Sequence, residues 1–297
     1  MSSLKVSAWL EAAWPPDALI SVANHVEKAG YHGVWLADHF MANTGTERRS
    51  DAGVHECFSL LAGLATTVPR VRLGSLVAGI TYRHPAVLAN VAATIDHLSA
   101  GRLVLGLGAG WQLNEHAAYG IELGPVAERI DRFEEAVQIV RGLLTEPRTT
   151  LQGKYYTVND APLEPKPLQP RLPILIGASG ERRMLAIVAA AADEWNCWST
   201  PEIFAQKSAV LNDHCARIGR DPKSIWRTTQ AILNFGDLDV DDSRFVTVGG
   251  SVDRIVDTVG QWRASGLDEW IVRSMGSPDE ARELFTRVIE DVLPQLS

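Results

Sequence analysis

Two residues that can exchange protons follow one of the apolar runs of the sequence. The stretch GVWLADHF, residues 33–40, predicts a strand, and Asp38 and His39 stand at its end. Successive residues of an extended chain point to opposite sides, so only one of the two can face a site beyond the strand. A histidine there can act as an acid or a base near neutral pH. From the residues alone, a purely structural histidine is the alternative.

A second candidate is the glycine-rich stretch LVLGLGAGW, residues 103–111. A dinucleotide fingerprint needs the spacing G-x-G-x-x-G between a strand and a helix. Here the spacing is G-x-G-x-G, and Trp111 stands where that helix should begin, so the dinucleotide interpretation fails. A strand end without side chains lets a flat ring or a phosphate approach the backbone, whereas a bulge or a tight corner of a sheet fits the same residues.

The stretch IGASGE, residues 176–181, is a third candidate, because backbone N–H groups, the Ser179 hydroxyl and the start of a helix together suit an anion. A plain strand-to-helix turn with Ser179 as the helix cap is the alternative.

The sequence lacks the residue patterns that several other kinds of functional site require. The three cysteines are far apart without a CxxC pattern, and the eight histidines show no metal-binding spacing, which argues against a metal site. None of the six lysines lies near the ends of the last four predicted strands, which disfavours a Schiff-base aldolase. A GxSxG nucleophile elbow is also absent.

Composition narrows the class of protein further. The chain has 297 residues, of which 46% are hydrophobic and 22% charged, so it can bury a sizeable core. Its net charge of -8 and the lack of a basic block disfavour nucleic acid as a partner. No apolar run approaches the roughly 20 residues of a membrane span, and the amino terminus does not read as a secretion signal. We therefore expect a cytoplasmic protein without a membrane partner.

Short apolar runs alternate with amphipathic ones along the chain. Most predicted helices lie between the predicted strands, at 16–31, 56–68, 85–101, 126–145, 201–218 and 252–266, with one more through about residue 192 and another at the carboxyl end. Predicted strands are 5–10, 33–40, 71–80, 102–111, 174–179, 194–199, 225–233 and 269–275.

Eight such units predict an α/β fold, a single (β/α)8 TIM barrel over residues 1–297. A proline-rich surface excursion at about 146–172, with a small hairpin, is inserted between strands four and five. A doubly wound sheet is the alternative. In a barrel, catalytic groups lie where strands end, which is where the three candidates stand.

The block LGSLVAGITYRHPAVLANVAATIDHLSAGRLVLGLGAGWQLNEHAAYG, residues 73–120, resembles the bacterial luciferase-like monooxygenase superfamily, and more narrowly its F420-dependent oxidoreductase branch. GVWLADHF before it, and ERIDRFEEAVQIVRGLL, PILIGASG and GSVDRIVDTVGQWRASGLDEWIV after it, extend the resemblance over nearly the whole chain. The resemblance implies a (β/α)8 barrel with a flavin or deazaflavin lying across the carboxyl-terminal mouth.

The resemblance also assigns roles to residues. It places His39 beside the reactive centre of the ring as an acid or base, with Asp38 next to it as a cofactor-binding residue. Ser75 and Leu76 align with a non-proline cis peptide that supports the ring from behind. The loops expected to bind the cofactor comprise Gly108, Gly110, Gln112 and Asn114, and then Gly177, Ala178, Ser179 and Gly180.

Three aromatic residues, Phe40, Trp111 and Trp198, are candidates for the substrate pocket, although they could equally be core. The sugar-phosphate dehydrogenase branch has a carboxylate where this chain has Trp111 and a tryptophan where it has Asn43. It also has a lysine that is missing near EWNCWST. These departures disfavour sugar-phosphate oxidation and favour a less polar substrate.

We therefore expect coenzyme F420-dependent hydride transfer to or from a small organic substrate. The first alternative is a two-component FMN-dependent monooxygenase, and the second is a non-catalytic flavin-binding barrel. Substrate contacts are expected from the loops at 41–55 and 234–250. The resemblance also suggests a homodimer.

Overall fold

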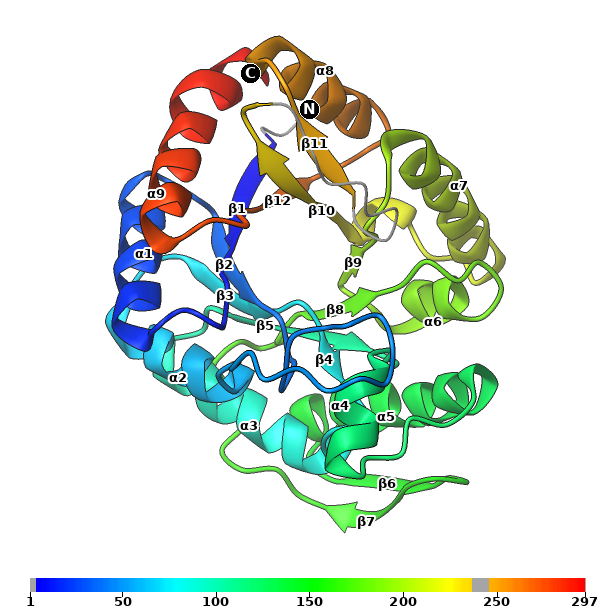
Figure 1. The fold of residues 1–297 in the computed structure, drawn as a ribbon. Coiled ribbons are helices and arrows are strands. Elements are labelled where there is room, and N and C mark those ends of the chain that lie inside the picture. The colour runs from blue at the N-terminus through cyan, green and yellow to red at the C-terminus, as the bar shows by residue number, and fades with distance from the viewer. Residues whose placement is uncertain (1–3, 237–245, 297) are drawn as a thin grey trace.

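A ring of parallel strands forms the centre of the molecule (Figure 1). A computed structural model describes residues 4–236 and 246–296, and within them β9 pairs with β10 and β12 pairs with β1, which closes the ring. The (β/α)8 barrel predicted from the sequence is therefore confirmed. Its strands in ring order are β1 (Lys5–Trp9), β2 (Gly33–Leu36), β3 (Arg72–Ser75), β5 (Leu103–Gly108), β8 (Ile174–Gly177), β9 (Glu194–Asn196), β10 (Trp226–Asn234) and β12 (Glu269–Arg273).

Helices surround this ring and bury their apolar faces against it (Figure 1). Local signals begin several of these helices: proline occupies the first turn of four of them, and Ser277 forms a capping box with Glu280. The surrounding helices are α1 (Pro16–Lys28), α2 (Cys57–Thr67), α3 (Pro85–Leu98), α5 (Val126–Thr145), α6 (Met184–Ala191), α7 (Pro201–Arg217), α8 (Val252–Ala264) and α9 (Pro278–Arg287). The short helical turns are η1 (Pro222–Ser224), η2 (Val288–Val292) and η3 (Leu293–Leu296).

The structure differs from the sequence prediction mainly at the strand ends. The predicted strand 33–40 ends at Leu36, and the predicted strand 71–80 is interrupted, so that only β4 (Ala78–Gly79) resumes it by pairing with β5. Two elements were not predicted, α4 (Leu113–Tyr119) and β11 (Thr247–Gly249). The excursion contains the expected hairpin, β6 (Thr149–Gln152) with β7 (Thr157–Ala161). Within the predicted loop 234–250, residues 237–245 lie outside the described residues.

Charged side chains close the barrel at the amino-terminal end of its strands. Arg72 forms ion pairs with Glu194 and Glu269, and the Trp35 and Trp226 indoles also donate to Glu269. Burial raises the pKa of Glu194 to about 7, despite the neighbouring Arg72.

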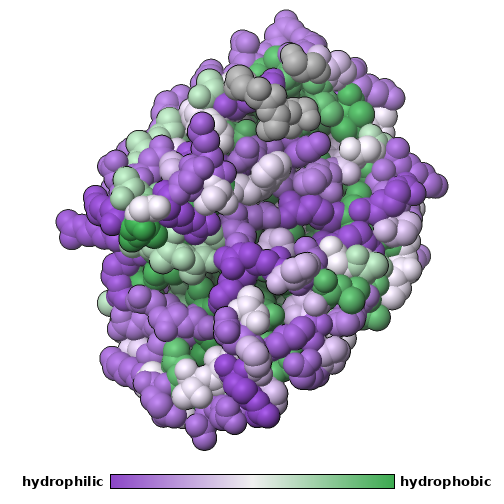
Figure 2. Space-filling view, turned by 180° about the vertical axis from the view of Figure 1, so that it is seen from behind, coloured by the Kyte–Doolittle hydropathy of each residue, from purple (hydrophilic) through white to green (hydrophobic). Residues whose placement is uncertain are grey.

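Hydrophilic residues cover much of the face seen in Figure 2, which is opposite to the one in Figure 1.

The interruption of β3 explains the glycines of β5. A Cβ atom on Gly106 would overlap the Ser75 carbonyl oxygen, and one on Gly108 would lie 2.6 Å from Val77 Cγ2. The expectation that these glycines leave room for a phosphate is corrected, because a bulge of the neighbouring chain occupies that room. We call residues 75–77 the β3 bulge.

The cis peptide bond lies in the β3 bulge, but one residue later than the resemblance suggested. It joins Leu76 to Val77 and not Ser75 to Leu76. The reason is that the ladder with β2 still includes Leu76, whose N–H donates to the Leu36 carbonyl at 2.7 Å, so the chain turns away only after it.

The packing of the β3 bulge predicts a cost for a side chain at Gly106. We expect Gly106→Ala to lower the free energy of unfolding by about 2 kcal/mol or more, because its methyl group meets backbone that cannot rotate away. Gly260→Ala in α8 is the matched control, since its Cβ meets nothing within 4 Å, and we expect it to stabilise by roughly 0.5 kcal/mol. Urea unfolding measures both, and equal stabilities of Gly106→Ala and wild type would contradict the assignment.

Candidate active site

A histidine and a buried carboxylate form the centre of the candidate site. His39 follows β2 and Glu115 lies in α4, and His39 Nδ1 is 2.7 Å from Glu115 Oε1. The Glu115 side chain is fully buried, whereas the His39 side chain is 22% exposed. An ionised carboxylate only accepts hydrogen bonds, so Nδ1 carries a proton, and in the neutral imidazole Nε2 keeps its lone pair. This arrangement gives His39 one free basic nitrogen.

Glu115 is held in place by two further donors. The Phe40 amide donates to its Oε2 at 2.7 Å, and the Tyr82 hydroxyl donates to its Oε1. Burial by itself raises the pKa of Glu115, but the hydrogen bonds and charge from His39, Phe40 and Tyr82 outweigh burial and lower that pKa. Burial and the bond to Glu115 raise the pKa of Tyr82, which keeps its proton. Glu115 is therefore a fixed anion behind His39.

Asp38 binds other partners than its neighbour His39 does. It is 1% exposed and forms a two-pronged ion pair with Arg83, at 2.7 and 3.0 Å. Its Oδ2 also accepts from the Gly79 amide at 3.3 Å. Burial raises the pKa of Asp38 even though Arg83 opposes that effect. Asp38 thus ties the loop after β2 to β4, and its expected role in cofactor binding stays a prediction.

The predicted aromatic residues fall into two groups. Trp111 is 53% exposed, and its ring meets the His39 ring edge to face, with centroids 5.4 Å apart. Phe40 packs against Tyr82 at 4.9 Å and therefore supports the carboxylate network. Trp198 belongs to another part of the mouth, where its ring lies 5.4 Å from that of Trp9. Trp111 is thus the one of the three that touches the candidate acid or base.

The first predicted cofactor loop is largely occupied by its own structure. The Gln112 and Asn114 amides are buried and donate to the carbonyls of Met41 and Ala42, at 2.9 and 2.8 Å. These amides hold the loop that follows His39, while Asn114 Oδ1 has no partner among the described residues, and the expected cofactor contacts of both side chains stay predictions. Gly110 has a φ of +84°, and its carbonyl accepts from Arg129.

The second predicted loop has the donors that an anion needs. The Ala178 amide donates to the Asn196 carbonyl, but the amides of Ser179 and Gly180 have no acceptor among the described residues. Ser179 and Gly180 are exposed. The alternative role of Ser179 as a helix cap is wrong, because the cap of α6 is Arg183. The chemistry of these free donors fits a phosphate-bearing cofactor.

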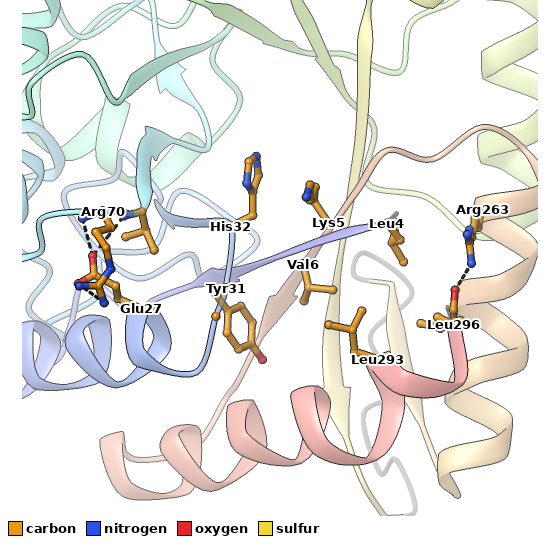
Figure 3. A pocket seen from close by; sticks show the side chains of 12 residues that line it. Leu4, Lys5, Val6, Glu27, Tyr31, His32, Arg70, Arg263, Leu293 and Leu296 are labelled. Atoms are coloured by element: carbon orange, nitrogen blue, oxygen red, sulfur yellow. Dashed lines mark hydrogen bonds and ion pairs between the residues drawn. The ribbon is translucent and has the colours of Figure 1, made fainter. Parts of the chain in front are cut away.

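One cavity lies away from these residues, at the amino-terminal end of the strands. It measures about 740 Å³ and is lined from the starts of β1 and β3, the residues before β2, and η3 (Figure 3). His39 and Trp111 lie beyond the opposite ends of the strands, so the size of a cavity does not locate the site here. In a (β/α)8 barrel the carboxyl-terminal end carries the chemistry.

The described residues contain neither a group of metal ligands nor a membrane-spanning helix. Within residues 4–236 and 246–296, no three His, Cys, Asp or Glu side chains are grouped as metal ligands would be. None of the described helices combines the length and hydropathy of a membrane-spanning segment.

Sequence reasoning found His39 but missed the residues that hold it. Glu115, Tyr82 and Arg83 lie within the quoted segments NEHAAYG and TYRHP. Their chemistry could have been read there, but the contact with His39 spans 76 residues of sequence and requires α4, which the sequence did not predict.

The barrel, the β3 bulge and a carboxylate-bound histidine at the mouth define a (β/α)8 enzyme site. A family model described as luciferase-like monooxygenase matches residues 1–269, and the chain belongs to this family. The family assignment predicted from residues 73–120 is confirmed.

Curated relatives include enzymes of two kinds. The chain is 33% identical over 224 residues to an F420-dependent glucose-6-phosphate dehydrogenase of Kineococcus radiotolerans, a match that covers 74% of this chain and 64% of that protein. It is 35% identical over 172 residues to the pyrimidine monooxygenase RutA of an Enterobacter species, covering 56% of this chain and 47% of the relative. The matches thus span less than two thirds of these relatives' own lengths.

Solved structures share the whole fold at low identity. An F420-dependent secondary alcohol dehydrogenase in complex with an F420-acetone adduct superimposes with a TM-score of 0.84 at 17% identity, over all of both chains. The coenzyme F420-dependent tetrahydromethanopterin reductase of Methanopyrus kandleri superimposes with a TM-score of 0.82 at 16% identity, again over all of both chains. At these identities the similarity shows the fold.

The contact between His39 and Glu115 predicts the effect of neutralising the carboxylate. We expect Glu115→Gln to lower turnover by roughly 100-fold or more, because an amide no longer fixes the Nδ1–H tautomer. Nitrogen NMR of the imidazole should show a protonated Nδ1 in the wild type and a mixture of tautomers in the variant. Glu122→Gln at the exposed Arg132 pair is the control, and an unchanged tautomer in Glu115→Gln would refute the role.

Proposed function

We propose that this protein is an oxidoreductase that binds coenzyme F420 and exchanges a hydride with a small organic substrate. The observation that carries the proposal is His39, held by Glu115 with one basic nitrogen free at the mouth of a barrel of this family. Relatives named as F420-dependent support the choice of cofactor.

The chain contributes proton transfer and orientation to this reaction. Coenzyme F420, when bound, accepts a hydride from the substrate carbon or returns one to it. In the oxidising direction, His39 Nε2 takes the proton of the substrate hydroxyl while the hydride leaves the adjacent carbon. In the reducing direction the same nitrogen returns that proton to the oxygen. Glu115 stabilises the charged imidazole that exists between these steps.

Two segments would hold the cofactor. The β3 bulge supports the ring from behind, where Val77 lies against Gly108 and Gly177. The free amides of Ser179 and Gly180 bind the phosphate end, because backbone N–H groups are good partners for an anion.

The proposed substrate is less polar than a sugar phosphate. Trp111 places an exposed ring against His39, at the position where the sugar-phosphate branch carries a carboxylate. An aromatic wall favours an apolar body next to the reacting carbon.

An FMN-dependent monooxygenase is the second candidate function, favoured by the similarity to pyrimidine monooxygenases. The non-catalytic barrel is disfavoured, since the candidate acid or base and its carboxylate are both present. The homodimer, the cytoplasmic location and the single domain over 1–297 stay predictions.

The proposal of F420 as the cofactor predicts that coenzyme F420 and FMN bind the protein with different affinities. We expect coenzyme F420 to quench the tryptophan fluorescence of the protein saturably, and FMN at the same concentrations to do so weakly, because the site is proposed to fit the deazaflavin. Tight binding of FMN without F420 would overturn the proposal in favour of the monooxygenase. Binding of neither would favour the non-catalytic barrel.

The role of His39 predicts a separation of binding from chemistry. We expect His39→Ala to leave the affinity for F420 within a few-fold of wild type and to lower turnover by about 100- to 10,000-fold, the usual contribution of an acid or base. His55→Ala, at an exposed position, is the control. Loss of F420 affinity with a normal rate per bound cofactor would show that His39 is a binding residue instead.

A further inference from the structure

One oxygen of the Glu115 carboxylate accepts hydrogen bonds from two side chains. Glu115 Oε1 accepts from His39 Nδ1 at 2.7 Å and also from the Tyr82 hydroxyl. The other oxygen, Oε2, accepts from the Phe40 amide at 2.7 Å. A carboxylate oxygen has two lone pairs, so both bonds to Oε1 form at once, but they draw on the same negative charge. The strength of one bond therefore depends on the presence of the other.

The Tyr82 ring is fixed in the position that makes this bond. It meets the Phe40 ring edge to face, with centroids 4.9 Å apart, and the His116 ring at 4.9 Å on another side. The Tyr82 amide donates to the Gly79 carbonyl at 3.1 Å, and a Cβ atom on Gly79 would lie 2.7 Å from the Tyr82 ring. The ring cannot turn away without moving these neighbours, so its hydroxyl oxygen stays beside Glu115.

The Tyr82 hydroxyl acts towards Glu115 only as a donor. Burial and the bond to Glu115 raise the pKa of Tyr82, so the hydroxyl keeps its proton. Burial also acts to raise the pKa of Glu115, but the donors around the carboxylate outweigh burial and lower that pKa. The carboxylate is therefore ionised and only accepts, and the tyrosine and the histidine compete as its donors.

Apart from this glutamate, the titratable groups nearest to His39 are paired or neutral. Asp38, on the same loop, is held by Arg83, which also binds Glu56. On α4, burial lowers the pKa of His116, which leaves that ring uncharged near neutral pH. How firmly the His39 imidazole holds a second proton therefore depends on the glutamate and on the donors that share its charge.

A carboxylate that is not shared would hold the imidazole in its charged form. An opposite charge within about 4–6 Å favours the charged state of a titratable group, and Glu115 Oε1 is only 2.7 Å from His39 Nδ1. An acid or base that serves both directions of a reaction must release the proton that it takes. A second donor on Oε1 draws part of the negative charge away from the bond to His39 and so eases that release.

We propose that Tyr82 is a positioning residue that sets the acid–base strength of His39 through the carboxylate oxygen that both side chains bind. The Tyr82 hydroxyl weakens the bond between Glu115 Oε1 and His39 Nδ1, so that Nε2 can both take a proton from the substrate and return it. Tyr82 acts through Glu115 and exchanges no proton itself. This inference rests on the proposed function only in naming that proton transfer, since the competition for Oε1 needs no cofactor.

The proton resonance of His39 Nδ1–H, assigned by its loss in His39→Ala, measures this competition directly. We expect Tyr82→Phe, which keeps the ring packed on Phe40 and His116, to move the resonance downfield from its wild-type position. The physical reason is that Oε1 is left with one side-chain donor, so the bond to Nδ1 becomes stronger. An unmoved resonance in a folded Tyr82→Phe, or an upfield shift, would overturn the proposal.

Tyr119→Phe is the matched control. The Tyr119 ring also packs on Phe40, with centroids 5.7 Å apart, but its side chain is 57% exposed and its hydroxyl binds none of the described residues. We expect this variant to leave the Nδ1–H resonance in place. The same downfield shift in both variants would assign the effect to ring packing and would refute the role of the Tyr82 hydroxyl.

A stronger donor in place of Tyr82 should give the opposite sign, and this test keeps the buried hydroxyl. A ring-fluorinated tyrosine at this position has a more acidic hydroxyl, so it draws more charge from Oε1 and should move the His39 Nδ1–H resonance upfield. A side chain that only fills space would give one resonance for tyrosine and fluorinated tyrosine. A resonance that does not move upfield on fluorination would contradict the proposal.

The pH dependence of turnover is a further readout that a structural residue would not move. In the oxidising direction the neutral imidazole accepts the substrate proton, so the rate rises with pH as His39 loses its second proton. Because Tyr82→Phe strengthens the hold of Glu115 on the charged imidazole, this limb should move to higher pH by roughly half a unit to one unit, about the worth of one hydrogen bond. A lower rate with the limb in its wild-type position would make Tyr82 a structural residue and refute the proposal.

The role of Tyr82 and the proposed function can fail separately. A downfield Nδ1–H resonance in Tyr82→Phe, in a protein that takes neither F420 nor FMN, would leave the competition for Oε1 in place and remove the proposed function. Normal binding of F420 with an unmoved resonance would do the reverse.

Discussion

The site depends on the β3 bulge, which places Val77 where two neighbouring strands have no side chains. A Cβ on Gly106 would overlap the Ser75 carbonyl, and Val77 lies against Gly108 and Gly177. Residues 75–77 therefore pack closely against β5 and β8 at one place near the carboxyl end of the barrel. The glycines of β5 are needed for packing, and the open backbone donors lie instead on the loop after β8.

Pairs of oppositely charged or hydrogen-bonded side chains hold the residues of the site. The chain after β2 leaves the sheet at Leu36, and its next two polar side chains are each held by a residue far away in sequence, Asp38 by Arg83 and His39 by Glu115. Each pair joins the same loop to the region around β4 and α4. The acid or base is thus held rigidly from behind, while Trp111 covers its open side. On the other side of β1, Glu11 neutralises Arg273, whose guanidinium lies over the Trp9 ring.

Much of the fold could be predicted because its causes are local. Apolar periodicity and the alternation of strand and helix predicted the barrel, and the predicted helix 126–145 matches α5 residue for residue. The errors lie where strands end. Leu36, Ser75 and Gly108 each stop a strand that the apolar pattern would continue, because pairing with the neighbouring strand ends there. Gln112 and Asn114 hold the loop at Met41 and Ala42, a contact that the local sequence does not encode.

The sequence by itself determined the class of fold, the family and the presence of a histidine at the end of the second strand, since these depend on periodicity and on motifs of neighbouring residues. Only the tertiary structure decided the partners of that histidine, the occupant of the glycine-lined space and the meeting of Arg273 with Glu11 and Trp9. The physical reason is that barrel closure brings β12 beside β1, and residues 262 positions apart then share one ion pair.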